Sequence, residues 1–415
     1  MSAPAPAPGP APRITSVDQF RGFVVAGMVL VNFLGDFDRV RADAPVLLHH
    51  NTYFSFADTV MPAFHFAVGF ALRLTYLRRR TRTGPGATWA HFAQRLVGLA
   101  LIGVVLEAAE EKRADWADFH TRTFWDVLGP LLKSGFWNTL TIIAVTSLWV
   151  LPVVGAGART RLAFLVAGSA LHLVCCATFY FPFMEGQPSP LSGIWGGDRP
   201  RGLDGGPLGF LAWAVPQLVG TFAYDLLART RPLHAFVALL VWGTLFSAAG
   251  YALSCVAMLY PPTDPPTRNE GGITVAASPV VLPFDRVPAD PRALLADPPF
   301  VQPSAGDQRQ LNYWLMTKRV VPLPFQLAST GYALLVFAAF VLVCDAGGCA
   351  LGLFRTFGQN ALAAYLTHEI VGRAVSNYAP HDAPWPWIAG SFVAYSLLTY
   401  AFVRQLERKN IFLRM

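Results

Sequence analysis

Two adjacent histidines and an aspartate stand at the start of an apolar stretch near the beginning of the chain. His49 and His50 immediately precede this stretch, and Asp58 lies one turn inside it. Imidazole can act as a base or a nucleophile near neutral pH, and a carboxylate can orient the ring and stabilise imidazolium. Either histidine, with Asp58, could therefore deprotonate an amine or hydroxyl, or carry an acyl group itself.

Further polar side chains are expected at a similar depth. Asn32 lies about ten residues into the preceding apolar span, roughly 15 Å along a helix, and could donate an amide N–H to a developing oxyanion. His368 and Glu369 lie at a comparable depth when residues are counted from the cytoplasmic end of the later span near residues 357–376. Ionisable groups at membrane depth cost about 2.5 to 3.5 kcal/mol each. We therefore expect these side chains to face one external cavity.

Structural roles remain open for each of these residues. Asp58 could cap its helix, and Asn32 could hydrogen-bond a neighbouring helix. His368 and Glu369 could form a structural pair, and His65 is expected to be a packing or pore-facing partner of Asp58. No metal site is predicted, because no set of His, Asp and Glu has a recognisable ligand spacing.

The elements that position these residues must be membrane helices. Hydrophobic residues make up 53% of the chain and charged residues only 14%, and the mean hydropathy is +0.41. These values indicate an all-α polytopic membrane bundle rather than a soluble protein. Apolar runs of the length that crosses a bilayer predict about ten spans, near residues 22–37, 54–76, 90–109, 136–154, 162–183, 208–227, 234–259, 325–344, 357–376 and 385–403.

Arginines in the short connections predict the orientation. With the N-terminus in the cytoplasm, each even-numbered connection is cytoplasmic, and these connections carry Arg78 to Arg80, Arg159, Arg161, Arg229, Arg231 and Arg355. The C-terminal tail is also basic, which predicts that both termini are cytoplasmic. The net charge of +7 is therefore mainly a topology signal, and no nucleic-acid partner is expected.

The segments outside the spans differ in character. Residues 1–12 are rich in Pro and Ala, which predicts a disordered, extended N-terminus before one membrane domain over residues 13–415. The connection at about 260–324 is long and Pro-rich, and we interpret it as a partly ordered external lid. Asp18 and Arg21 fall at the cytoplasmic end, where they could form an anchoring salt bridge or where the guanidinium of Arg21 could bind phosphate groups.

Two blocks of sequence suggest a family. RITSVDQFRGFVVAGMVLVNFLGD and the following LLHHNTYFSFADTVMPAFHFAVGF resemble the start of the transmembrane acyltransferases typified by heparan-alpha-glucosaminide N-acetyltransferase. TFGQNALAAYLTHEIV, with Asn360, is similar to a late span of that family. YWLMTKRVVPLPFQ, with Lys318, resembles the segment that enters its antepenultimate span. The resemblance makes Asn360 and Lys318 candidates for binding substrate or cofactor.

The chain departs from the family pattern in the loop that carries the histidines. It has a His pair in place of a single His, so either His49 or His50 could act. NTYFSF stands where the family usually has a tryptophan and a glycine, and the middle motif is reduced to LLKSGFWNT. These differences bear on the identity of the acceptor more than on the architecture.

The resemblance implies an acetyltransferase of the cytoplasmic (inner) membrane. Acetyl-CoA from the cytoplasm would be the donor, and an amine or hydroxyl of an envelope sugar or glycan would be the acceptor. Two alternatives stay open: a proton-coupled secondary transporter and a non-catalytic envelope assembly protein. The protein could also form a homodimer. A membrane-buried Asp near His could serve a proton relay, although no clear internal repeat supports a transporter.

Overall fold

The fold is a bundle of helices, as expected. The computed structural model describes residues 14–50, 53–110, 116–121, 123–133, 135–195, 204–261, 274–302 and 309–413. Within these residues there is no strand, and an isolated bridge pairs Val275 with Leu311. The all-α prediction is therefore confirmed, whereas the predicted disordered segment 1–12 lies outside the described residues.

Eight helices of the described chain are long and apolar enough to cross a membrane, by length and composition. They are α1 (Thr15–Leu34), α3 (Val60–Thr83), α4 (Pro85–Glu110), α8 (Ala158–Cys175), α11 (Gly209–Arg229), α12 (Pro232–Ser254), α13 (Leu323–Phe340) and α16 (Trp385–Arg408). Two of them are extended by π-helical turns, at Cys176–Tyr180 after α8 and at Val341–Ala346 after α13. The chain is a multi-pass membrane protein.

The other two predicted spans are also helical but shorter. The fourth is the apolar helix α7 (Thr139–Val154). The ninth is divided into α14 (Gly352–Gln359) and α15 (Ala361–Ser376), because Asn360 between them has a non-helical backbone. All ten predicted spans thus correspond to helical segments, and the estimate of about ten is consistent with the structure.

Helix α1 begins at Thr15, earlier than the predicted residue 22. The backbone N–H groups of Thr15 and Ser16 donate to Oδ1 of Asp345 at 3.1 and 3.0 Å, and the Ser16 hydroxyl donates to Oδ2. The first donors of a helix need acceptors from outside the helix. Asp345, at the end of the α13 segment, supplies them and lets α1 start before its apolar run.

Glycines allow two pairs of helices to pack with their backbones in contact. A Cβ on Gly69 of α3 would lie 1.7 Å from a carbonyl oxygen of α11, and one on Gly220 of α11 would lie 2.1 Å from a carbonyl oxygen of α3. Gly22 of α1 and Gly358 of α14 are matched in the same way, at 1.8 Å each. Small residues are the usual means of close helix packing in membranes, and here they fix α3 against α11.

The core lies between α1, α3, α11 and α13. Phe337 of α13 is at its centre, with edge-to-face contacts to Phe20, Phe66 and Phe70 at centroid separations of 5.3, 5.3 and 5.5 Å. In contrast, α4, α8, α12 and α16 expose most of their apolar side chains. Those four helices therefore present the surface that lipid would cover.

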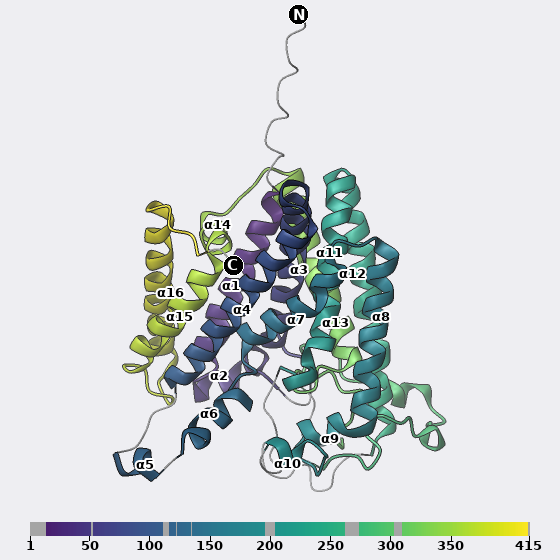
Figure 1. Ribbon diagram of the computed structural model, residues 1–415. Coiled ribbons are helices and arrows are strands. Elements are labelled where there is room, and N and C mark those ends of the chain that lie inside the picture. The colour runs from purple at the N-terminus through teal and green to yellow at the C-terminus, as the bar shows by residue number, and fades with distance from the viewer. Residues whose placement is uncertain are drawn as a thin grey trace, which may run out of the picture.

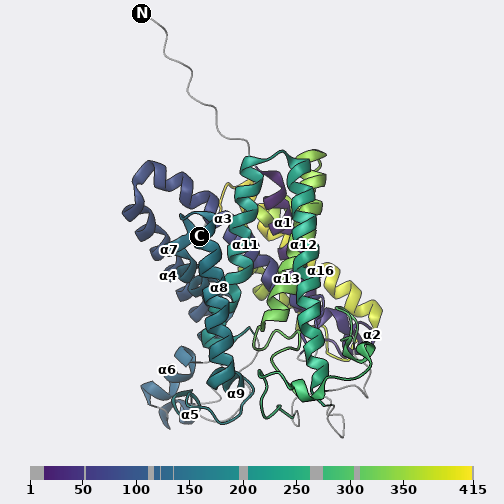
Figure 2. The same cartoon turned by 90° about the vertical axis from the view of Figure 1, so that its right-hand side faces the viewer.

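The two ends of the bundle differ, and we name them for what they carry. The loop end carries the short helices α2 (Asp38–Asp43), α5 (Trp116–Thr121), α6 (Phe124–Lys133), α9 (Phe181–Met184) and α10 (Ser192–Trp195), as Figures 1 and 2 show. At the opposite end, the arginine end, α1 begins and α16 ends, joined through α14 by Gly358 beside Asp18 and by Thr356 donating to Glu407. The arginine distribution predicts that this end faces the cytoplasm.

Candidate active site

His49 and Asp58 form an ion pair or hydrogen bond at the loop end. His49 Nδ1 lies 2.8 Å from Asp58 Oδ1. Asp58 is on the 3₁₀ turn Ala57–Thr59 that leads into α3, and it is fully buried. Its second oxygen accepts from Ser55, at 3.2 Å from the backbone N–H and 2.9 Å from the hydroxyl. The carboxylate is therefore held in place on both sides.

This arrangement decides which nitrogen of His49 is available for chemistry. Because Asp58 accepts a hydrogen bond, we assign the ring proton to Nδ1, which leaves the lone pair on Nε2. The His49 side chain remains 33% exposed, while Asp58 is shielded from solvent. His49 is thus an oriented and partly exposed imidazole, and a general base or a nucleophile requires an oriented ring that a substrate can approach.

His50 has a different environment. Its Nε2 donates to the carbonyl oxygen of Pro45 at 2.6 Å, and its ring stacks on Tyr53 at a centroid separation of 4.3 Å. Burial lowers the pKa of His50, and burial together with the nearby charge of Asp58 raises the pKa of Tyr53 to about 12. His50 is therefore a neutral ring engaged with its own loop, which separates two histidines that the sequence left equivalent.

Ser55 is a site residue that the sequence analysis missed. Its hydroxyl accepts from the Asp58 N–H at 3.4 Å while it also donates to the Asp58 carboxylate. The spacing S-x-x-D immediately before an apolar run is the reciprocal pattern of a helix N-terminus. That signal was present in the sequence, where Ser55 stands three residues before Asp58.

Asn32 and His368 meet across the bundle. Asn32 Nδ2 lies 3.1 Å from His368 Nε2, a contact between residues 336 positions apart, and Glu369 Oε1 lies 3.4 Å from the same nitrogen. His368 Nδ1 donates to the carbonyl oxygen of Tyr365, so its Nε2 accepts from the Asn32 amide. The structure thus joins α1 to α15 through residues that the sequence placed at a common depth.

The contact between α1 and α3 places this pair and His49 on the same side. A Cβ on Gly27 of α1 would lie 3.6 Å from Val60 of α3. Asn32 follows Gly27, and Asp58 precedes Val60, so both lie beyond this contact toward the loop end. In the described hydrogen bonds, His49 with Asp58 and Asn32 with His368 nevertheless remain two separate groups.

The long loop before α13 reaches the segment that holds Asp58. Its Phe300 donates a backbone hydrogen bond of 2.8 Å to the carbonyl oxygen of Phe54, and the two rings lie 5.3 Å apart. Phe300 has a φ of 69°, which is unusual for a bulky residue. The loop is also tied to α12 by the Tyr251 hydroxyl, which donates to the carbonyl oxygen of Ala296 at 2.8 Å.

Lys318 forms a buried ion pair at the loop end. Its Nζ lies 2.6 Å from Asp204 Oδ1, and both side chains are largely buried. The next residue, Arg319, lies 3.7 Å from Glu185. Burial raises the pKa of Glu185 to about 7, against the opposing effect of Arg319. Asp204 and Glu185 come from distant segments, so neither partner was identified from the sequence.

Arg21 and Asn360 lie toward the arginine end. Asn360 uses both ends of its amide on the C-terminal segment, donating to the carbonyl oxygen of Ile411 at 2.9 Å and accepting from the N–H of Leu413 at 3.0 Å. Arg21 is partly buried next to Gly22, where α1 and α14 touch. Neither residue contributes to the His49 group, and their binding roles stay predictions.

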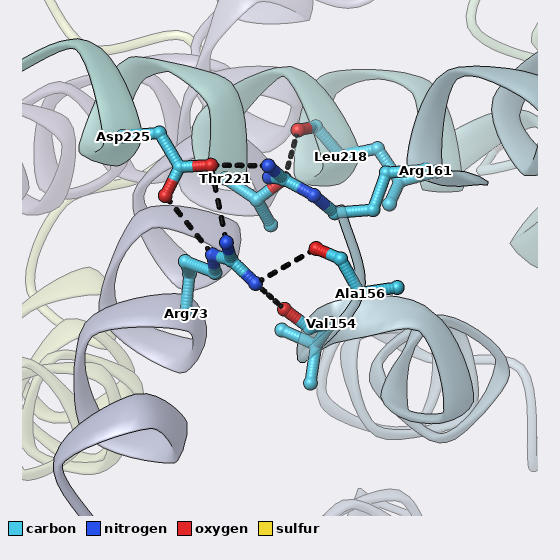
Figure 3. Close-up of polar contacts among 7 residues, drawn as sticks. All are labelled: Arg73, Val154, Ala156, Arg161, Leu218, Thr221 and Asp225. Atoms are coloured by element: carbon cyan, nitrogen blue, oxygen red, sulfur yellow. Dashed lines mark hydrogen bonds and ion pairs between the residues drawn. The ribbon is translucent and has the colours of Figure 1, made fainter. Parts of the chain in front are cut away.

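A buried charge cluster at the arginine end was also missed. Arg73 of α3 donates to both oxygens of Asp225 on α11 at 3.1 and 3.2 Å, and Arg161 of α8 pairs with the same carboxylate (Figure 3). Arg73 also donates to the carbonyl oxygens of Val154, the last residue of α7, and of Ala156, just after it. The sequence predicts Arg161 only as a topology signal, whereas the structure buries it completely.

Comparison with known families now bears on this geometry. The model of the catalytic domain of heparan-alpha-glucosaminide N-acetyltransferase matches residues 13–239, more than half of the 415 residues. The chain belongs to this family. A comparison with curated proteins gave no match. Within this N-acetyltransferase family match lie Arg21, Asn32, His49, His50 and Asp58, whereas Lys318, Asn360, His368 and Glu369 come after it.

Membership in the heparan-alpha-glucosaminide N-acetyltransferase family supports an acetyltransferase-type activity in a membrane. The predicted family is confirmed. In the described part of the chain, no group of three or more His, Cys, Asp or Glu residues is arranged to hold a metal ion. The site consists of an imidazole with a buried carboxylate partner, and acyl transfer is chemistry that these groups can perform.

Proposed function

We propose that the protein transfers an acetyl group from cytoplasmic acetyl-CoA to an amine or hydroxyl of an envelope sugar or glycan on the external side of the cytoplasmic (inner) membrane. The observation that carries this proposal is the 2.8 Å contact between His49 Nδ1 and the fully buried Asp58, in a His49 side chain that is itself 33% exposed. Family membership supports the acetyl transfer, and the donor, acceptor and sidedness are proposed here.

His49 Nε2 has two routes to the products. In the first, it attacks the thioester carbonyl, the C–S bond breaks, and the acetyl group remains on the ring until the acceptor nitrogen or oxygen takes it. In the second, Nε2 takes the proton of the acceptor while the acceptor attacks the thioester directly. In the first route the leaving thiolate takes a proton from water, and the acceptor later releases its own proton to solvent. In the second route Nε2 passes the acceptor's proton to the thiolate. Asp58 stabilises the positively charged ring in each.

The neighbouring polar groups have proposed supporting roles. Asn32 is exposed, and one of its amide hydrogens is directed to His368, so the other is available to a developing oxyanion. His368 and Glu369 would orient Asn32, and Lys318 would act at the loop end on the acceptor side. Arg21, at the predicted cytoplasmic end, suits the phosphates of a donor that enters from there.

A transfer assay tests the proposal. Purified protein is incubated with labelled acetyl-CoA and a panel of amino sugars and glycan extracts, and free coenzyme A and acetylated sugar are measured. We expect His49→Ala to abolish transfer and His50→Ala to retain most of it, with thermal midpoints confirming that both variants are folded. Acid quenching that traps labelled protein in the wild type would favour the acyl-histidine route.

Two results would count against this function. One is transfer that survives His49→Ala in a folded protein, which would remove His49 from the chemistry. The other is a wild-type protein that moves no label with any acceptor but carries a proton-coupled flux in vesicles, which would favour a transporter.

A further inference from the structure

A second polar group lies inside the bundle, two turns along α3 from Asp58. His65 follows Asp58 by seven residues, which places it on the same helix face, roughly 10 Å deeper. It is fully buried, and its ring stacks on Trp213 of α11 at a centroid separation of 5.0 Å and an interplanar angle of 9°. Met61, between Asp58 and His65, packs in the same cluster as Trp213. The predicted pairing of His65 with Asp58 is not among its hydrogen bonds.

The placement of the Gln217 amide assigns the tautomer of His65. In the structure, Gln217 Nε2 donates to the hydroxyl of Ser147 at 2.8 Å, and Gln217 Oε1 lies 3.3 Å from His65 Nδ1. Because a carbonyl oxygen only accepts, we assign the ring proton to Nδ1 and the lone pair to Nε2. Within the described residues, His65 Nε2 has no hydrogen-bond partner although it is buried. Such an unpaired acceptor is costly unless something else satisfies it.

The surroundings of His65 also have the character of a binding site. The backbone oxygen of Asp204 accepts from Trp213 Nε1 at 2.9 Å, and the Asp204 carboxylate pairs with Lys318. Asp204 and the buried Val321 both have positive φ values, 70° and 55°. A β-branched residue rarely adopts this conformation, and such strain tends to gather at ligand sites.

A second unpaired acceptor lies beside the strained segment. Gln326 is almost fully buried, its Nε2 donates to the carbonyl oxygen of Val321 at 2.8 Å, and its Oε1 has no partner among the described residues. Phe325, next to Gln326, packs edge-to-face on Trp213 and so connects the start of α13 with the His65 group. The region between α3, α11 and the start of α13 therefore contains two buried atoms that can only accept hydrogen bonds.

We propose that His65 Nε2 accepts a hydrogen bond from an N–H or O–H group of a substrate, so that this region is a binding site below the His49 centre. The proposal rests on the acetyl-transfer function proposed above. A carbonyl or phosphate oxygen does not fit, since it would face a lone pair. The N–H or O–H has two sources: the amine or hydroxyl of the acceptor, or an amide N–H in the arm that carries the donor's thioester.

Steady-state kinetics with two variants tests this binding site. His65→Phe keeps a flat ring against Trp213 but removes the acceptor, and His65→Gln restores an acceptor oxygen. We expect His65→Phe to raise the KM of one substrate by about 3- to 10-fold, as for one neutral hydrogen bond, with little change in kcat. His65→Gln should recover part of this loss. A raised KM for the acceptor identifies the acceptor, and a raised KM for acetyl-CoA identifies the donor arm.

Two kinetic outcomes overturn the binding site. One is an unchanged KM for both substrates in His65→Phe, which leaves the imidazole satisfied by water alone. The other is an equal fall in kcat in both variants, which marks a structural role. His172→Phe is a matched control, because His172 is another fully buried histidine of a long apolar helix.

A separate binding measurement distinguishes failure of this site from failure of the proposed function. If the wild type transfers no acetyl group, the function fails, and His65 is then tested without turnover. Acetyl-CoA and a non-acetylated amino sugar are each added to wild type and His65→Phe, and the shift in thermal midpoint is recorded. A shift with either ligand that shrinks in His65→Phe supports the site, and equal shifts overturn it.

Discussion

The two ends of helix α3 carry charged groups that are built in opposite ways. At the loop end, His49 contacts one buried carboxylate, keeps a third of its side chain exposed and makes no second ring hydrogen bond with the residues that the structure describes. At the arginine end, Arg73 and Arg161 share Asp225, and Arg73 also donates to two backbone carbonyls (Figure 3). The first group leaves bonding capacity toward solvent, and the second directs its charges inward.

This difference separates a reactive site from a structural one. Chemistry needs an atom that a substrate can reach, whereas a buried ion pair is stable only when its charges are fully compensated. The Arg73 cluster joins α3, α8, α11 and the end of α7, so it fixes their relative positions. Ion pairing alone therefore does not mark function, and the proposed role of His49 rests on its partly exposed ring as well as on its ion pair.

After the loss of His49 itself, replacing Asp58 should give the largest effect on activity. In Asp58→Asn, the new amide can donate to His49 Nδ1 and move the ring proton to Nε2, which removes the lone pair that the reaction uses. We expect acetyl transfer to fall about 10²- to 10⁴-fold, measured as kcat/KM, with a nearly unchanged thermal midpoint. A variant that retains full activity would show that the tautomer of His49 is irrelevant.

Replacing Asp225 should instead affect stability. Asp225→Ala leaves two buried guanidinium groups without a carboxylate, and we expect a loss of about 3 to 5 kcal/mol in the free energy of unfolding. The triple variant Arg73→Met, Arg161→Met and Asp225→Leu should recover most of that loss. Thermal or denaturant unfolding in detergent provides the measurement.

A surface ion pair provides the control for Asp225. Arg286 and Asp285 lie 4.0 Å apart and are both exposed. Arg286→Ala should change stability by less than about 1 kcal/mol. If Asp225→Ala lowered the free energy of unfolding no more than Arg286→Ala, the Asp225 cluster would not have the structural role that its burial indicates.

The pH dependence of stability should trace to Glu185 at the loop end. Its pKa is raised from 4.5 to about 7 in the folded protein, so folding favours its protonated form. Its contribution to the free energy of unfolding is about 3 kcal/mol. This contribution is complete below about pH 4.5 and is lost as the pH rises through 7. Glu185→Gln should reduce the pH dependence of the thermal midpoint between pH 4.5 and 8. Asp285→Asn, at an exposed position, should leave that pH dependence unchanged.

The smallest effect is expected for His50. His50→Gln can still donate toward Pro45 and lie against Tyr53. We therefore expect kcat/KM to change by less than about 10-fold, which is the effect of losing one hydrogen bond completely. Side-by-side assays with His49→Gln measure the contrast. An equal fall in kcat/KM in the two variants would show that both histidines are needed for transfer.

Local features of the site and of the fold could be predicted from the sequence. The apolar runs have the length that a bilayer requires, so all ten helical segments were found. His49 and Asp58 are close in sequence, and the turn between them brings them together. The depth of Asn32 and His368 also followed from counting along helices, because helical rise is constant.

Contacts that depend on the packing of distant helices could not be predicted. Arg161 ends in a buried site only because Thr221 and Asp225, on a helix 60 residues later, accept its hydrogen bonds. Asp204 finds Lys318 in the same way. Sequence spacing gives the face and depth of a residue on its own helix, but it does not say which helix lies opposite.

The cap that Asp345 places on α1 has a consequence for biosynthesis. Helix α1 is made first, yet the carboxylate that accepts from Thr15 and Ser16 is about 330 residues further along the chain. At a synthesis rate of about 5 to 20 residues per second, that carboxylate emerges roughly 20 to 60 s later. The opening turn of α1 is therefore complete only after the α13 segment has been made. The docking of these two segments is a late step of assembly.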